Sequence, residues 1–159
     1  HTPFMEEHLH IIGRLDLDTE GLLVFTTDGE MTHAVTSPKN HHSKTYFVRL
    51  RDSVDKKTQT DYIAQCKSGI HIPPEGNEAE ADCLPADLVF RNTDIENTNE
   101  CELTIYEGKF HEVKRIFAVL GNEVAYLKRL SIGRLHLDES LKTGEYREMS
   151  DDEALSLKL

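Results

Sequence analysis

The chain has 159 residues, a length that one compact domain accommodates. Its 38% hydrophobic and 30% charged residues, with five Pro and nine Gly, exclude collagen-like, coiled-coil and wholly disordered chains. No apolar run approaches the ~20 residues of a membrane span. The 18 Lys+Arg against 29 Asp+Glu give a formal net charge of −11, which argues against non-specific binding of nucleic acid by the whole surface. An RNA partner would therefore need a local basic patch.

The three cysteines, Cys66, Cys83 and Cys101, are odd in number and lie far apart. No C-x-x-C pair occurs, so the sequence predicts neither a disulfide framework nor a zinc knuckle. Unpaired cysteines fit a reducing compartment. We therefore expect a cytoplasmic protein.

Turn residues and apolar periodicity divide the first half of the chain. The pattern predicts strands over residues 22–26 and 45–50 and helices over residues 30–36 and 55–67. The second helix is expected to bury Tyr62, Ile63 and Cys66 on one face. The acidic residues 75–82 are expected to form a solvated loop.

In the second half, strands predominate. The pattern predicts strands over residues 84–90, 101–106, 124–132 and 135–137, and helices over residues 110–120 and 151–157. The first helix carries an apolar stripe of Phe110, Val113, Phe117 and Leu120. Many strands with few helices, not strictly alternating, indicate an α+β domain with a mixed, mainly antiparallel sheet flanked by helices. We assign residues 1–159 to one such domain.

An acidic segment at residues 13–21 is the densest polar group. Its Asp16, Asp18 and Glu20 imitate the start of a calcium loop, but the twelfth position is Thr27, where a bidentate Glu is required. Asp16 is also a candidate nucleophile or general base, with Asp18 as a second carboxylate. Turn chemistry explains the same residue types, because Asp, Thr and Gly favour loops. Spacing alone leaves these alternatives open.

A second polar group, residues 107–115, lies at the start of the helix expected at 110–120. His111, Lys114 and Arg115 fall three and four residues apart, away from the apolar stripe, and form a local basic ridge. The ridge is either a solvated helix face or a site that holds phosphates or pairs with a carboxylate. Lys44, Lys128, Arg129 and Arg134 are candidates to extend it.

Metal and cofactor motifs are weak or absent in the sequence. His8, His10, His41 and His42 suggest a metal site, but adjacent histidines on an irregular segment point in different directions and no Cys or carboxylate completes the set. No phosphate-binding loop, dinucleotide fingerprint or nucleophile elbow occurs. We expect no metal and no cofactor.

The polar groups belong to a longer ordered pattern. It reads G-R-L-D-L-D-T-E-G-L-L at residues 13–23, T-D-G at 27–29, K-T-Y-F-V at 44–48, L-T-I-Y-E-G-K-F-H-E-V-K-R at 103–115, L-K-R-L-S-I-G at 127–133 and G-E-Y-R at 144–147. This pattern resembles the RsuA-type ribosomal RNA pseudouridine synthases over nearly the whole chain. One difference is Glu112, where the family more usually has Gln.

The resemblance implies the isomerisation of one uridine in ribosomal RNA to pseudouridine, without a cofactor. It implies that Asp16 is the catalytic residue, that Tyr46 stacks on the target base and assists proton removal, and that Lys114 pairs with Asp16. It also implies substrate-binding residues, namely Arg14, which helps to flip the base, and His111, Arg115 and Arg129. A target base must leave its stack to be reached, and an aromatic ring compensates for part of the lost stacking.

The choice of RNA rests on finer details of the same blocks. His111 and residues 128–133 look more like the small-subunit enzymes, so 16S ribosomal RNA is the preferred substrate and 23S ribosomal RNA the alternative. A catalytically silent RNA-binding or ribosome-assembly module is the rival from another class, and the intact Asp16, Tyr46 and Lys114 argue against it. A hydrolase using Asp16 and Asp18 lacks a second acid at a known spacing.

The start of the chain suggests a piece of a longer protein, because it begins at His1 without an initiator Met. Members of the resembled family usually begin with a small basic RNA-binding domain of the S4 type. We expect the chain to lack that domain and the first strand region of the catalytic domain. The resemblance further implies a monomer with ribosomal RNA as its partner and no membrane contact.

Overall fold

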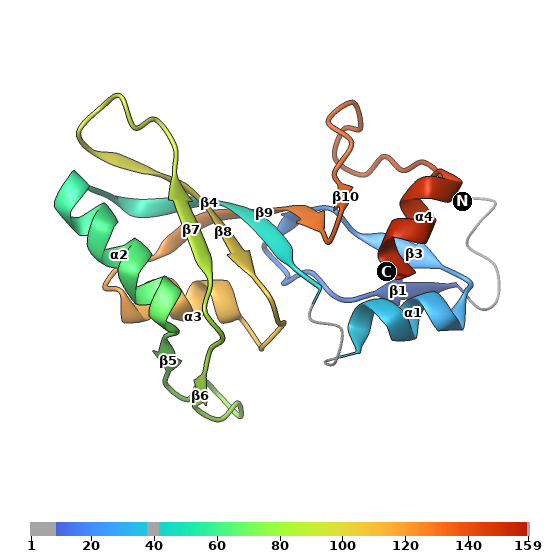
Figure 1. Ribbon diagram of the computed structural model, residues 1–159, viewed down its shortest axis with the longest axis horizontal. Helices are drawn as coiled ribbons and strands as arrows, with labels where there is room; N and C mark the ends of the chain where they lie inside the picture. Colours follow the sequence, from blue (N-terminus) through green and yellow to red (C-terminus); the bar gives the residue numbers. More distant parts are fainter. Residues whose placement is uncertain (1–8, 38–41, 159) are drawn as a thin grey trace.

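The computed structural model describes residues 9–37 and 42–158 (Figure 1). Its strands are β1 His10–Ile12, β2 Glu20–Gly21, β3 Val24–Thr26, β4 Lys44–Val54, β5 His71–Ile72, β6 Ala81–Asp82, β7 Asp87–Phe90, β8 Thr98–Ile105, β9 Val124–Ile132 and β10 Leu135–His136. Its helices are α1 Gly29–Thr36, α2 Lys56–Ser68, α3 Glu112–Val119 and α4 Asp151–Lys158. These elements confirm the predicted α+β class.

The main sheet has the strand order β10-β9-β4-β8-β7, with every neighbouring pair antiparallel. β2 adds a short parallel pairing to β9, with Glu20 opposite Lys128 and Gly21 opposite Arg129. The sheet is therefore mixed and mainly antiparallel, as predicted. The parallel pairing connects the segment after Asp16 to the middle of the sheet.

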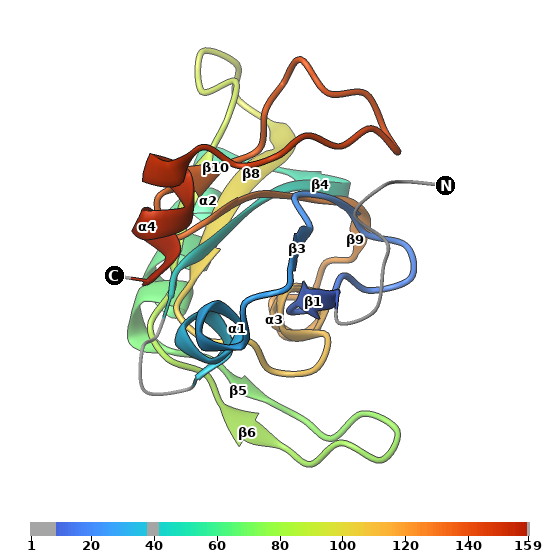
Figure 2. The same ribbon diagram turned by 90° about the vertical axis from the view of Figure 1, so that its right-hand side faces the viewer.

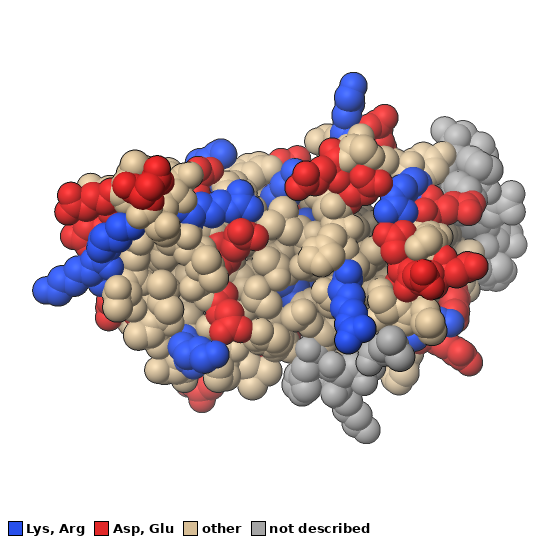
Figure 3. All heavy atoms as spheres, turned by 45° about the horizontal axis from the view of Figure 1, so that its top comes forward, with Lys and Arg blue, Asp and Glu red and all other residues tan. Residues whose placement is uncertain are grey.

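Helices α2 and α3 cover one face of this sheet (Figures 1 and 2). Their apolar side chains form the larger core with alternate residues of the strands, including Val48, Leu103 and Leu127. On the opposite face, Phe47 is buried against Tyr126, with 5.8 Å between ring centroids, and Arg91 pairs with Glu102 at 3.1 Å. Figure 3 shows basic and acidic side chains interspersed on the side of the molecule that it displays, without one continuous basic surface.

A second, smaller core lies at the other end of the molecule, where α1 packs against β1 and β3, and α4 packs against α1 and β10 (Figure 1). Asp28 begins α1 by accepting the backbone N–H of Glu30 at 2.9 Å, and its other oxygen lies 2.9 Å from Lys158 Nζ on α4. Ser150 begins α4, as predicted, by accepting the N–H of Glu153 at 3.1 Å. This end of the molecule supports the loop that carries Asp16.

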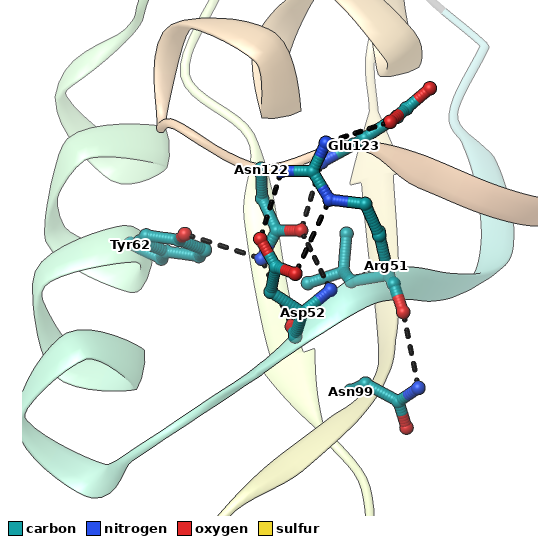
Figure 4. Close-up of polar contacts among 7 residues, drawn as sticks. Arg51, Asp52, Tyr62, Asn99, Asn122 and Glu123 are labelled. Atoms are coloured by element: carbon teal, nitrogen blue, oxygen red, sulfur yellow. Dashed lines mark hydrogen bonds and ion pairs between the residues drawn. The ribbon is translucent and has the colours of Figure 1, made fainter.

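A buried amide holds the far end of the main sheet together (Figure 4). Asn122 Oδ1 accepts the backbone N–H groups of Asp52 and Glu123 at 3.2 and 2.8 Å. Asn122 Nδ2 donates to the Asp52 carbonyl at 3.0 Å and to the Tyr62 hydroxyl at 3.4 Å. One side chain thereby connects β4, α2 and the start of β9.

Three details of the sequence prediction are wrong. Ile63 is 39% exposed, because the buried face of α2 is centred on Tyr62 and Cys66. Phe110 is 45% exposed and precedes α3, because His111 takes a left-handed conformation that prevents the helix from starting earlier. The acidic segment 75–82 is partly a hairpin, since β6 pairs with β5. No helix within the described ranges is both long and apolar enough to cross a membrane.

Candidate active site

The acidic segment of the sequence forms a turn between β1 and β2. The N–H of Thr19 donates to the Asp16 carbonyl at 2.9 Å, and the N–H of Leu22 donates to the Arg129 carbonyl at 2.9 Å. Gly21 has a φ of +114°, and a Cβ added there would lie 2.2 Å from the Arg129 carbonyl oxygen. Only glycine allows this close approach to β9. The loop is therefore fixed at its C-terminal end, and the Asp16 side chain stays partly exposed.

Helix α3 and the residue that precedes it bring two side chains, Lys114 and His111, to this loop. Lys114 Nζ lies 3.9 Å from Asp16 Oδ2, and His111 Nε2 lies 3.8 Å from Asp16 Oδ1. The prediction of a shared site, with Asp16 beside the polar side of the helix that carries Lys114, is confirmed.

Asp18 is closer to Lys114 than the sequence suggested. Its Oδ1 accepts a short hydrogen bond from Lys114 Nζ, although the Asp18 side chain is 72% exposed. This bond holds the pKa of Asp18 below its ordinary value. Lys114 thus faces two carboxylates, Asp16 and Asp18.

His111 is held in a rare backbone conformation at the start of α3. Its φ and ψ are 48° and 34°, and its ring stacks on Phe110 with 3.8 Å between ring centroids. His111 Nδ1 lies 2.8 Å from Glu75 Oε2 in the segment between β5 and β6. Left-handed non-glycine residues cost free energy and gather at functional sites. No local pattern in the sequence indicates that Glu75 contacts this histidine.

Tyr46 lies on β4 opposite Arg129 of β9, on the sheet face that α2 and α3 cover. Burial raises the pKa of the Tyr46 hydroxyl, and the positive charge of Arg129 opposes that rise. The charge of Asp16 contributes to the rise in the Tyr46 pKa. The structure thus pairs Asp16 of the loop with Lys114 of α3, and Tyr46 lies on β4 opposite Arg129, the residue of β9 that pairs with the same loop at Gly21.

The expected exposed ridge is wrong for two of its members. Arg115 is 5% exposed, and its guanidinium donates to the backbone carbonyls of Phe110, Pro73 and Ala79 at 2.8–3.0 Å. Arg129 is 1% exposed. The hairpin of β5 and β6 covers Arg115, and helix periodicity cannot reveal such a cover. Arg14 is exposed, in keeping with a residue that meets a substrate.

Comparison with known proteins decides the family. The family model described as RNA pseudouridylate synthase matches residues 3–119. The ribosomal small subunit pseudouridine synthase A of Vibrio parahaemolyticus is 46% identical over 151 residues, which cover 95% of this chain and 60% of that protein. The chain belongs to the RNA pseudouridylate synthase family. The resemblance to the RsuA-type enzymes is thereby confirmed.

Further relatives agree with this membership. The protein of the same name from Haemophilus influenzae is 45% identical over 145 residues, covering 91% of this chain and 57% of that protein. A crystal structure of a pseudouridylate synthase superposes with a TM-score of 0.83 at 43% identity, covering 94% of this chain and 60% of that chain. The chain thus spans about 60% of the length of the curated relatives that it matches.

A cluster of buried ionisable groups surrounds Glu112, at the start of α3. Glu112 is buried; its Oε1 accepts the N–H of Lys109 at 3.0 Å, and its Oε2 has no hydrogen-bond partner among the described residues. Burial, the largest cause, raises the pKa of Glu112 to about 7, and the nearby charge of Glu107 acts in the same direction. Lys44 lies close by, and burial lowers its pKa.

The same cluster is the one group of possible metal ligands found in the described residues. Cys83, Glu107 and Glu112 bring one ligand atom each within 4.8 Å of one another. Lys109 Nζ already lies 3.1 Å from Glu107, and a second cation would be repelled. We interpret the cluster as two carboxyl groups and a thiol without a metal.

The histidine metal hypothesis gains no support. His8 and His41 lie outside the described residues. His10 and His42 join no group of three possible ligands in the part of the chain that the structure describes.

Proposed function

We propose that the chain isomerises a specific uridine of 16S ribosomal RNA to pseudouridine, without a cofactor. The proposal depends on one observation, the placement of Asp16 within 3.9 Å of Lys114 in a domain of the RNA pseudouridylate synthase family. In this reaction the bond from ribose C1′ to uracil N1 breaks, the uracil turns, C1′ bonds to C5, and the C5 proton leaves.

Asp16 is the proposed catalytic carboxylate and acts first at the sugar. Lys114 Nζ lies 3.9 Å from Asp16 and supplies a positive charge beside the proposed catalytic carboxylate. Tyr46 presents its ring to the extruded base and its hydroxyl to the proton that leaves C5.

Arg14 and His111 are the proposed substrate contacts. Arg14 is exposed beside Asp16 and has the charge to meet phosphate or to fill the place of a flipped base. His111 reaches Asp16 with one nitrogen and Glu75 with the other. Arg115 and Arg129 were also predicted to bind substrate, but their burial supports roles within the protein instead.

The small-subunit substrate is supported by the names of the relatives, which are ribosomal small subunit pseudouridine synthases. A 23S substrate and a silent RNA-binding module are the alternatives. We also propose a cytoplasmic monomer, because one chain supplies the three proposed catalytic side chains and its cysteines are all free and buried.

Mapping pseudouridines in ribosomal RNA from cells with and without the gene tests this function. We expect one pseudouridine of 16S ribosomal RNA to disappear and to return when the full-length gene is supplied. Loss of a 23S pseudouridine would overturn the substrate assignment. An unchanged set of pseudouridines in both RNAs would favour the silent module.

A further inference from the structure

Arg129 is the largest side chain that is fully buried, at 1% exposed. It occupies the middle of β9, opposite Tyr46 of β4 and Gly21 of β2. Burying a guanidinium away from water is unfavourable unless hydrogen bonds and charges compensate for it. The groups that Arg129 contacts should therefore show what its burial achieves.

The partners of Arg129 are backbone carbonyls of the catalytic loop. Its Nε donates to the Leu22 carbonyl at 2.9 Å, and its Nη1 donates to the Arg14 carbonyl at 3.4 Å. These two carbonyls belong to the two ends of the segment that contains Asp16. Among the described residues, no carboxylate oxygen lies within 4.0 Å of the Arg129 guanidinium.

The main chain of Arg129 holds the same segment. Its carbonyl accepts the N–H of Leu22 at 2.9 Å, and Gly21 approaches it too closely for any Cβ. The guanidinium also lies on the sheet face shared with Tyr46, and its interaction with the Tyr46 hydroxyl acts to lower the pKa of that hydroxyl against the effect of burial. The side chain therefore connects both ends of the Asp16 loop to the strand that faces Tyr46.

We propose that Arg129 is a positioning residue that fixes the Asp16 loop against Tyr46, rather than a residue that binds RNA. The inference rests on the proposed function, since it assigns a role within that site. A planar guanidinium donates in fixed directions to two separated carbonyls, which the single ammonium of lysine cannot reproduce. An apolar side chain of similar length would remove both hydrogen bonds and leave the loop free to move.

Two variants of the full-length protein test the proposal, Arg129→Met and Arg129→Lys. We expect Arg129→Met to slow single-turnover pseudouridine formation by about 100-fold, because misplacing a reacting group by ~1 Å has this effect. The dissociation constant for ribosomal RNA should change less than about threefold, since Arg129 makes no surface contact. Arg129→Lys should recover part of the rate. Arg51→Met, at an exposed and distant arginine, is the matched control and should change neither quantity.

Hydrogen–deuterium exchange separates this proposal from the proposed function. In Arg129→Met, exchange should become faster in residues 14–22 while the amides of β4 and β8 stay protected, whether or not the protein is an enzyme. Unchanged exchange in that segment, or a loss of RNA affinity with an unchanged rate, would overturn the positioning role. If Arg129→Met does not fold, the exchange and rate of Arg129→Lys decide between the same outcomes.

Discussion

The two ends of the main sheet differ in how completely their buried polar side chains are hydrogen-bonded. Around Asn122, each side-chain donor and acceptor atom has a partner, and the amide connects three elements (Figure 4). Around Asp16, buried polar atoms without a hydrogen-bond partner in the described structure gather on the loop, α3 and β9. They are Thr19 Oγ1, Glu112 Oε2, Arg115 Nε and Arg129 Nη2.

This difference teaches where the molecule is built for stability and where for chemistry. A satisfied buried amide contributes to one unique packing, whereas an unsatisfied donor or acceptor costs about 1–3 kcal/mol. Natural proteins keep such costs at functional sites and offset them elsewhere. Substitutions at the Asn122 end should therefore change stability, and substitutions of the side chains that contact Asp16 should change rate. The buried Glu112 should make stability depend on pH.

Among the substitutions that test this comparison, we expect the largest effect, a loss of reaction rate, at Lys114. Lys114→Met should slow single-turnover pseudouridine formation by about 100-fold or more, because it removes the cation that faces Asp16 and Asp18. Tritium release from RNA labelled at uridine C5 measures the rate. Lys67→Met, at an exposed lysine paired with Asp87, is the control and should keep the wild-type rate. A threefold or smaller loss in Lys114→Met would remove Lys114 from the site.

Because of Glu112, we expect the free energy of unfolding to depend on pH. The Glu112→Gln substitution should remove this contribution. The folded pKa, about 7, is raised above the ordinary 4.5, so the folded protein binds a proton that the unfolded chain releases between these values. The free energy of unfolding therefore falls as pH rises from about 4.5 to 7, by at most about 3 kcal/mol from this group.

Urea denaturation of the wild type and Glu112→Gln at several pH values measures this contribution. Glu112→Gln should be the more stable protein at pH 8 and should lose most of that advantage at pH 5. Glu96→Gln, at an exposed carboxyl, serves as the control and should leave the pH profile unchanged. An equal difference between wild type and Glu112→Gln at both pH values would contradict the raised pKa.

A smaller loss is expected at the satisfied end. Asn122→Ala should lower the free energy of unfolding by about 1–2 kcal/mol, because water can reach the exposed Asp52 backbone groups that the amide leaves behind. Asn99→Ala, which removes one hydrogen bond to the Leu50 carbonyl, should cost less. The rate of pseudouridine formation should stay at the wild-type value. A slowed rate with unchanged stability would reverse the assignment of the two ends.

The sequence predicted the elements better than the burial of single charged residues. Apolar periodicity located α2, α3 and the long strands within a few residues, since those stripes form the larger core. The same periodicity placed Arg115 on an exposed face, because the covering hairpin of β5 and β6 comes from 30 or more residues away. Likewise, the left-handed backbone of His111 shortens α3 and exposes Phe110, and no local pattern marks it.

For the candidate site, the sequence likewise predicted residues that lie together but missed contacts between distant segments. Asp16, Tyr46 and Lys114 came from ordered family blocks, and the structure places Asp16 within 3.9 Å of Lys114. The contacts of Asp18 with Lys114 and of Glu75 with His111 join residues 96 and 36 positions apart. Such pairings depend on how the loop and the hairpin pack on α3, which the sequence of either segment does not contain.

The most direct test compares Asp16→Asn with Asp18→Asn, since both carboxylates face Lys114 but one alone is proposed to react. Single-turnover tritium release from uridine-labelled 16S ribosomal RNA, with full-length variants, gives both rates under the same conditions. We predict that Asp16→Asn abolishes release while folding and RNA binding persist, because an amide keeps the shape and loses the charge and nucleophilicity. Asp18→Asn should slow release by less than about tenfold, the effect of one exposed ion pair. A wild-type rate for Asp16→Asn, or a greater loss for Asp18→Asn, would contradict the assignment of Asp16 as the catalytic carboxylate.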